Sequence, residues 1–181
     1  MVTTKLVTAE ELEAMDEDAR YELIRGELRP MSPVGDPHGT LLFRVGSPVD
    51  RHINENLLGR LSGGDVGIIL ESDPDTVLAA DMAFFRELPR SFTDIEEGFV
   101  RQRPTLVVEI ASPSDSKQDL RQKGMQFLDA GVPHVWLVES RTRSVSWIGQ
   151  DRIERVFRVG DILDGGDLIP GFRLAVVDII R

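Results

Sequence analysis

Two hydrophobic patterns of different period follow one another in the middle of the chain. Residues 106–111 (LVVEIA) and 135–138 (VWLV) are apolar, β-branched runs of strand length. Between them, apolar or small residues recur at the spacing of one helix face: Leu120, Gly124, Phe127 and Leu128. Asp115 with Gln118 predicts a capping box at the start of this helix. The pattern indicates a strand–helix–strand unit with parallel strands and a right-handed crossover.

The exception in the first of these strands is Glu109. Side chains alternate between the two faces of a strand, so Leu106, Val108 and Ile110 are predicted to face the core. Glu109 then lies on the other face, which is small and mixed. A carboxylate inside an apolar strand is costly unless it is paired, protonated or bound to a metal. The plain alternative to a metal site is an ion pair between Glu109 and a lysine or arginine.

The stretch LAADMAFF repeats this arrangement around Asp81. The acid shares its face of the predicted strand with Ala79 and Ala83. Two strand acids, each flanked by alanine, leave room for a cation. We therefore expect Asp81 and Glu109 on adjacent strands of one sheet, close enough to share one cation. The alternative is that Asp81 merely marks the start of a strand.

The rest of the pattern predicts two helices before this unit. The first spans residues 8–16 and is capped by Thr8. The second begins at Asp36 or Gly39, and Pro48 should kink it or divide it. Gly63-Gly64 is expected to end that segment.

The remaining predicted elements are strands and hairpins within one domain that spans residues 1–181. The first hairpin turns at Gly26 and directs Leu23 and Leu28 inward. In chain order, the predictions are a hairpin at 21–31, strands at 66–71 and 80–86, and a hairpin at 144–148 and 152–158.

Composition excludes several classes of protein. The chain has 181 residues, of which 41% are hydrophobic and 29% charged, as in ordinary globular domains. It has no cysteine, which excludes disulfides and thiolate metal sites. No signal peptide or membrane-length apolar run is visible, so we expect a cytoplasmic protein without a membrane partner. The sequence also lacks a phosphate-binding glycine loop and a serine-hydrolase elbow. The surviving candidate is a set of oxygen ligands, which suits Mg²⁺ or Mn²⁺.

The net negative charge of the chain argues against a nucleic-acid partner, unless basic residues form a local positive surface. The net charge is −10, and binding to duplex DNA draws most of its affinity from basic side chains on phosphates. Five basic residues surround the central acids in sequence: Arg101, Arg103, Lys117, Arg121 and Lys123. They predict either a local positive rim or an ordinary solvated surface.

Several motifs occur together in one order. ELIRGEL is followed by a strand Asp, then LVVEIASPS, then D-x-x-x-K-x-x-x-F-x-x-x-GVP with a Trp-bearing strand, and finally PGFRL. This set resembles the Uma-two family of restriction-endonuclease-like proteins, assigned to the PD-(D/E)xK nuclease superfamily. Two positions depart from that pattern, because Ala80 replaces the usual proline before the Asp and Ala111 replaces the usual lysine after the Glu. Lys123, in the following helix, matches the lysine of the family.

The resemblance implies an α/β restriction-endonuclease-like fold, with a mixed central sheet flanked by helices and a hairpin near each end. It also implies hydrolysis of phosphodiester bonds in nucleic acid, with DNA expected, in the presence of Mg²⁺ or Mn²⁺. Asp81, Glu109 and the backbone carbonyl of Ile110 would hold the metal. Lys123 would orient the attacking water or stabilise the transition state, and Glu22 would be an outer catalytic ligand. The alternative is a catalytically silent binding or assembly module, and a homodimer is an option that the sequence leaves open.

Two further residues are candidates for substrate binding. Lys117, at the start of the predicted helix, is expected to point to solvent and to meet a phosphate. His38 opens the preceding helix, where a cap or a hydrogen-bonding residue is the plain alternative. Lys123 is expected within reach of the Glu109 carboxylate, with Asp119 holding its amine when no metal is bound. For Glu22 the alternative is an exposed residue of the hairpin.

Overall fold

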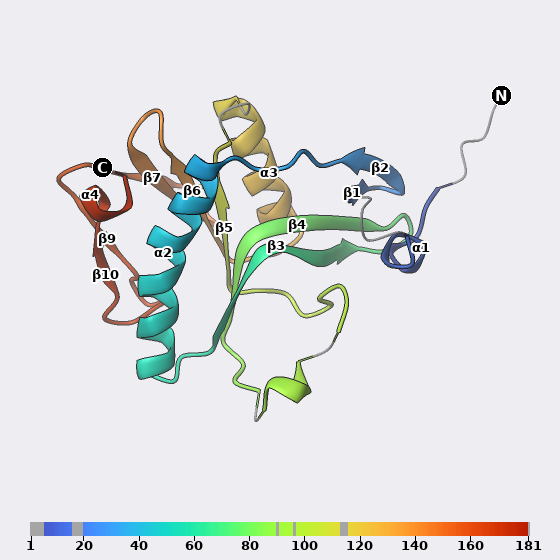
Figure 1. Ribbon diagram of the computed structural model, residues 1–181, viewed down its shortest axis with the longest axis horizontal. Coiled ribbons are helices and arrows are strands. Elements are labelled where there is room, and N and C mark those ends of the chain that lie inside the picture. The colour runs from blue at the N-terminus through green and yellow to red at the C-terminus, as the bar shows by residue number, and fades with distance from the viewer. Residues whose placement is uncertain (1–5, 16–19, 90, 96, 113–115, 181) are drawn as a thin grey trace.

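The computed structural model describes residues 6–15, 20–89, 91–95, 97–112 and 116–180. A mixed eight-stranded sheet forms its centre (Figure 1), in the order β2-β1-β4-β5-β6-β7-β8, with β3 paired to β4. The strands of this sheet are β1 Tyr21–Ile24, β2 Glu27–Pro30, β3 Arg60–Glu71, β4 Thr76–Phe85, β5 Leu106–Ile110, β6 His134–Glu139, β7 Ser144–Gly149 and β8 Glu154–Arg158. The other elements are α1 Ala9–Glu13, α2 Asp36–Glu55, the 3-10 turn Phe92–Asp94, α3 Lys117–Asp129, β9 Ile162–Asp164, β10 Arg173–Ala175 and α4 Val176–Ile179.

The predicted strand–helix–strand unit is β5, α3 and β6. The two strands are parallel, as predicted, and the helix buries the predicted face of Leu120, Gly124, Phe127 and Leu128. The predicted cap is wrong. Asp115 lies outside the described residues, and the N-cap is Ser116, which exchanges hydrogen bonds with Asp119. A serine three residues before an acid is itself a capping box, so the helix begins one residue later than that pairing implied.

Both faces of β5 are buried, which corrects the prediction of a single core side. Leu106, Val108 and Ile110 belong to a cluster that also contains the buried stripe of α2. Val107, on the face of Glu109, belongs to a second cluster under α3. Parallel strands covered by helices on both faces are apolar on both faces. Glu109 therefore lies in a packed interior, with 3% of its surface exposed.

α2 is one continuous helix of 20 residues, although Pro48 lies inside it. The expected division does not occur, because Val45, Val49 and Ile53 are fully buried on the sheet on both sides of the proline. This packing outweighs the loss of one backbone hydrogen bond. Leu57 lies beyond the helix end and is 74% exposed.

The Gly63-Gly64 pair does not end a segment but lies inside β3, which begins at Arg60. The pairing of β3 with β4 shifts register between Gly63 and Val66. Gly64 and Asp65 both have positive φ, at +94° and +61°, which is the local signature of a β-bulge. β4 is correspondingly longer than predicted and starts at Thr76.

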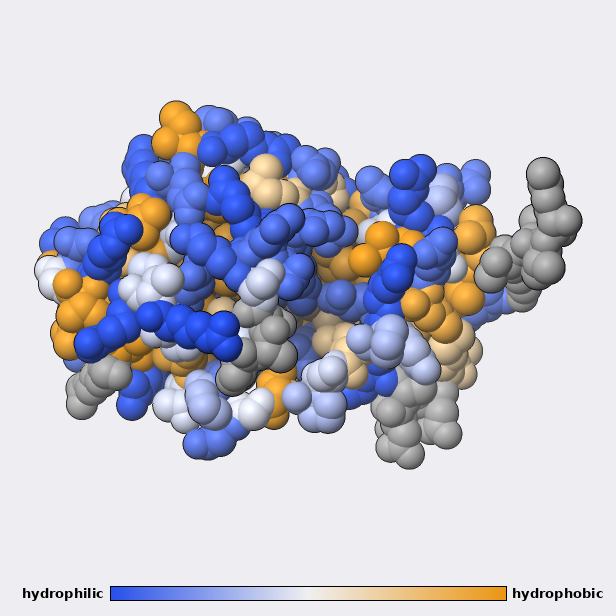
Figure 2. All heavy atoms as spheres, turned by 90° about the horizontal axis from the view of Figure 1, so that it is seen from above, coloured by the Kyte–Doolittle hydropathy of each residue, from blue (hydrophilic) through white to orange (hydrophobic). Residues whose placement is uncertain are grey.

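The N-terminal hairpin forms as predicted, with Arg25 and Gly26 at positive φ in a two-residue turn. Leu23 is fully buried and packs with Ala9, Leu12 and Val77 in a third cluster, next to the partly buried Leu28. Figure 2 shows mainly hydrophilic residues on the face seen from above, with groups of hydrophobic residues towards both ends. None of the helices that the structure describes is long and apolar enough to cross a membrane.

Candidate active site

One edge of β4 carries two partner strands with a gap between them. β3 pairs along the whole of β4, so β1 and β5 must both lie on the other edge. β1 pairs at Val77, and β5 pairs at residues 82–84. In Figure 1, β1 and β5 lie towards opposite ends of β4, with α3 next to the space between them. Residues 78–81 therefore face a local interruption of the sheet.

Polar side chains satisfy the backbone groups in this gap. The amide of Ala79 donates to Glu22 Oε1 at 3.1 Å, and its carbonyl accepts from Lys123 Nζ at 2.7 Å. At the other side of the gap, the amide of Ile110 donates to Asp81 Oδ2 at 2.6 Å. Buried backbone groups need partners, and here the residues predicted to be catalytic provide them in place of a strand.

Lys123 lies at the centre of this arrangement. Its Nζ is 3.0 Å from Glu109 Oε2 and 3.1 Å from Glu22 Oε1, in addition to the Ala79 carbonyl. An ammonium group has three donors, and these three oxygens can accept all of them. The predicted approach of Lys123 to Glu109 is confirmed. The expected role of Asp119 is wrong, because that carboxylate caps α3 through Ser116.

Burial dominates the electrostatics of Glu109. It raises the pKa of this carboxyl from 4.5 to about 8; Lys123 opposes the shift, and the charges of Asp81 and Glu22 add to it. Burial alone would lower the pKa of Lys123, but the carboxylates of Glu109 and Glu22 outweigh it and raise the pKa. Among the described residues, Glu109 Oε1 is buried with no hydrogen-bond partner. This oxygen is a free acceptor in the interior next to the gap.

Asp81 has a second partner in α2. His38 Nε2, in the first turn of α2, lies 3.1 Å from Asp81 Oδ1, and His38 is only 5% exposed. The predicted role of His38 in direct substrate contact does not agree with this burial.

The acids lie on paired strands, as predicted, but Asp81 contacts α2 and Glu109 contacts α3. No group of three or more His, Asp or Glu side chains gathers as a metal site in the described part of the chain. Sharing of one cation by the two acids stays a prediction.

The predicted positive rim is not an open surface. Lys117 is 65% exposed, as expected, but its Nζ lies 3.7 Å from Glu139 Oε1. The other members each have a partner: Arg101 with Glu10, Arg121 with Glu154, and Arg103 with the Leu70 carbonyl. Three of these four basic side chains are therefore paired with an acid.

Two features of the site were missed from sequence. The first is Glu139, the buried acid at the end of β6. It directly follows the apolar run VWLV, just as Glu109 lies in the apolar run LVVEI, and this similarity could have predicted a second buried strand acid. Glu22 is not an exposed hairpin residue, since its side chain is 16% exposed and contacts Lys123. No sequence signal predicted that contact, because it depends on the gap in the sheet.

Comparisons with known proteins bear on the family and the fold of the chain. A family model described as a putative restriction endonuclease matches residues 9–177. The fold is similar to a crystal structure of a putative nuclease belonging to DUF820 from Anabaena variabilis ATCC 29413. The TM-score is 0.80 at 16% sequence identity, covering 96% of this chain and 97% of that chain. This likeness confirms the predicted fold class. Among curated proteins, none matches the chain.

Proposed function

The chain belongs to the Uma2 family of putative restriction endonucleases, and from this premise we propose that it is a metal-dependent endonuclease. It would hydrolyse phosphodiester bonds in nucleic acid, with DNA as the expected substrate and a homodimer as the assembly to test. One observation carries the proposal. Glu109 is buried beside Lys123, keeps one unpartnered oxygen, and lies on the strand paired with that of Asp81.

The donor set suits a hard divalent cation. Oxygen ligands are those that Mg²⁺ and Mn²⁺ prefer, and the buried Oε1 of Glu109 lacks any other partner among the described residues. Asp81, Glu109 and the carbonyl of Ile110 would hold the ion. A carboxylate has about four lone-pair sites, so Asp81 can bind an ion while it keeps Ile110 and His38. When bound, the ion would lower the pKa of a water molecule and neutralise charge on the phosphate.

The side chains around these acids have separate roles in this proposal. Lys123 would direct the N–H group that contacts Glu109 in this structure towards the attacking water or the phosphate. Glu22 would keep Lys123 against Ala79, which makes it a positioning residue more than a ligand. His38 would orient Asp81 through the contact of its Nε2 with Oδ1. Lys117, which is exposed, would contact a phosphate of the substrate.

A catalytically silent module is the second candidate, and one observation favours it. Lys123 already occupies a cationic position among three oxygens, so the acids of the gap are compensated without a metal. In that case the acids and the lysine would only replace a missing strand.

A cleavage assay with metal titration separates the two candidates. Wild type is incubated with single- and double-stranded DNA and RNA in Mg²⁺ or Mn²⁺, beside Asp81→Ala and Glu109→Ala. Glu27→Ala, an exposed acid on β2, is the matched control. We expect cutting by wild type and the control, and none by the two site variants. Inert wild type with either metal would favour the silent module, and activity in both site variants would indicate a contaminant.

A further inference from the structure

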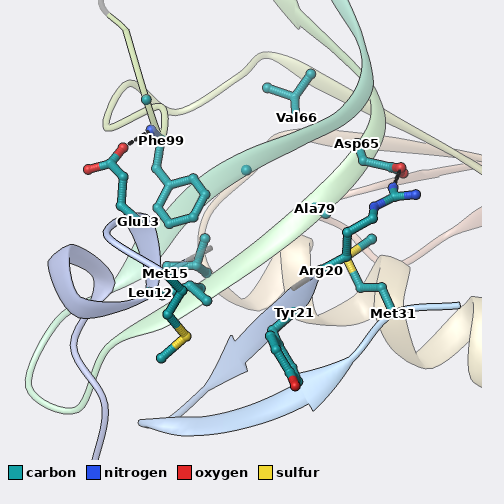
Figure 3. Close-up of a pocket in the computed structure, with 13 residues that line it drawn as sticks. Leu12, Glu13, Met15, Arg20, Tyr21, Met31, Asp65, Val66, Ala79 and Phe99 are labelled. Carbon is teal, nitrogen blue, oxygen red and sulfur yellow. Dashed lines mark hydrogen bonds and ion pairs between the residues drawn. The ribbon is translucent and has the colours of Figure 1, made fainter. Parts of the chain in front are cut away.

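A pocket of about 450 Å³ lies next to the gap, on the side of the N-terminal hairpin (Figure 3). α1, β1, the end of β2, the β3–β4 ribbon and the Gly98–Phe99 loop contribute to its wall. Ala79 belongs to both the pocket and the gap. It lines the pocket, while its amide donates to Glu22 and its carbonyl accepts from Lys123. Asp81 follows two residues further along β4, about 7 Å at strand rise.

The wall of the pocket is rich in flat and polarisable groups. Tyr21, Phe99, Met15 and Met31 line it, and all four are half-buried. Phe99 is held in place from two sides. Its amide donates to Glu13 Oε1 at 2.5 Å, and its ring lies so close to Gly67 that a Cβ there would be 2.3 Å from the ring. A fixed aromatic wall with a few polar groups is typical of a small-molecule or base site.

The charges of the pocket select against an anion. Figure 3 shows Glu13 and Phe99 on the α1 side and the Arg20–Asp65 ion pair at the opposite end, near Ala79. The wall therefore has two acids and one base, and the single cation is already paired. A phosphate would be repelled, whereas a neutral ring could stack on the aromatic groups and on the planar guanidinium of Arg20.

We propose that this pocket binds one unpaired nucleobase of the substrate strand, beside the phosphate presented to Asp81 and Glu109. The inference rests on the proposed nuclease function. It also explains how an acidic protein could hold nucleic acid. With a net charge of −10 and with Arg101 and Arg121 paired with acids, the chain gains little from phosphate attraction beyond Lys117. Base stacking supplies affinity that does not depend on positive charge.

The test is fluorescence anisotropy with the full chain in a metal-free buffer, where no cutting occurs. The probes are a labelled single-stranded oligonucleotide, the same strand with abasic sites, and the corresponding blunt duplex. We expect wild type to prefer the base-bearing strand over the abasic strand by about tenfold, and over the duplex as well. Tyr21→Ala should lose most of this preference, while Tyr21→Phe, which keeps the ring, should retain it. Phe43→Ala removes a 72% exposed ring on α2, outside the pocket, and should behave as wild type.

Equal affinity of wild type for the base-bearing and abasic strands would overturn the inference, and so would an unchanged preference in Tyr21→Ala. If wild type binds none of the three probes, the inference is overturned as well. The outcome is independent of the cleavage assay. A chain that cuts without a base preference refutes the pocket alone, and a chain with the preference that never cuts refutes the nuclease alone.

Discussion

Replacing Glu109 by glutamine should remove a pH dependence of the unfolding free energy. In the folded protein, burial raises the pKa of Glu109 from 4.5 to about 8. Between these values the folded state keeps a proton that the unfolded state has lost. Because the folded state binds more protons there, stability falls as the pH rises. The contribution of Glu109 is fully present below about pH 4.5 and is lost as the pH passes about 8.

The size of the effect follows from the same two pKa values. One unit of pKa difference corresponds to ~1.4 kcal/mol, which sets an upper bound of ~5 kcal/mol over the whole interval. Lys123 lowers the pKa of Glu109, and the value of about 8 already includes this opposing effect. Glutamine has nearly the same shape and no proton to lose, so the variant should show no such contribution.

The measurement is urea unfolding of wild type and Glu109→Gln at steps between about pH 5 and about pH 9. The difference between the two unfolding free energies cancels the titration of all other groups, provided that those groups are not altered by the change. Glu27→Gln, at an exposed position on β2, controls for the loss of a negative charge. A difference that stays flat with pH would refute the reasoning. If wild type instead becomes more stable than Glu109→Gln as the pH rises, Lys123 lowers the pKa of Glu109 below its ordinary value.

Further predictions concern the lysines, the helix cap and the pocket wall. Lys123→Ala should lower kcat/KM by about 10²–10³-fold, whereas Lys117→Ala should mainly raise KM; the reverse ranking in the cleavage assay would assign the site to Lys117. Ser116→Ala should lower the free energy of unfolding by about 1 kcal/mol, because the Ser116 hydroxyl caps α3. The control is Ser32→Ala, outside any helix or strand, and an equal loss of stability there in thermal or urea unfolding would contradict the prediction. Gly67→Ala should destabilise the fold by about 1–3 kcal/mol through a clash with Phe99. Its control is Gly39→Ala, where nothing lies within 4 Å of the added carbon, and a similar change in both would refute the clash.

The parts of the fold that depend on local pattern were predictable from the sequence. β5, α3 and β6 follow from two strand-length apolar runs and one helix stripe, and the reach of Lys123 to Glu109 follows from their regular rises. The errors at Pro48 and at Gly63-Gly64 have one cause. A residue that disfavours regular structure locally is tolerated where packing or a bulge accommodates it, and neither is visible in a short window.

The predicted residues of the site were found, but their contacts depended on long-range topology. The gap exists because β1 and β5 meet the same edge of β4 at different heights. Residues far apart in the sequence therefore become neighbours, such as Glu22 and Ala79, which are 57 positions apart. Glu22 and His38 acquired partners that no spacing in the sequence could assign. The pairing of Arg101, Lys117 and Arg121 with acids likewise required the folded chain.

The interruption along β4 also has a consequence for solubility. An unpaired strand edge is a template on which another chain can add a strand and start aggregation. Here the amide and carbonyl of Ala79, which no neighbouring strand pairs on this edge, are already bound by Glu22 and Lys123. An incoming strand would have to displace a carboxylate and an ammonium that contact each other. The same charged side chains proposed for catalysis thus protect the molecule from self-association at its one broken edge among the described strands of the main sheet. Variants that neutralise both of them should therefore self-associate more readily than wild type.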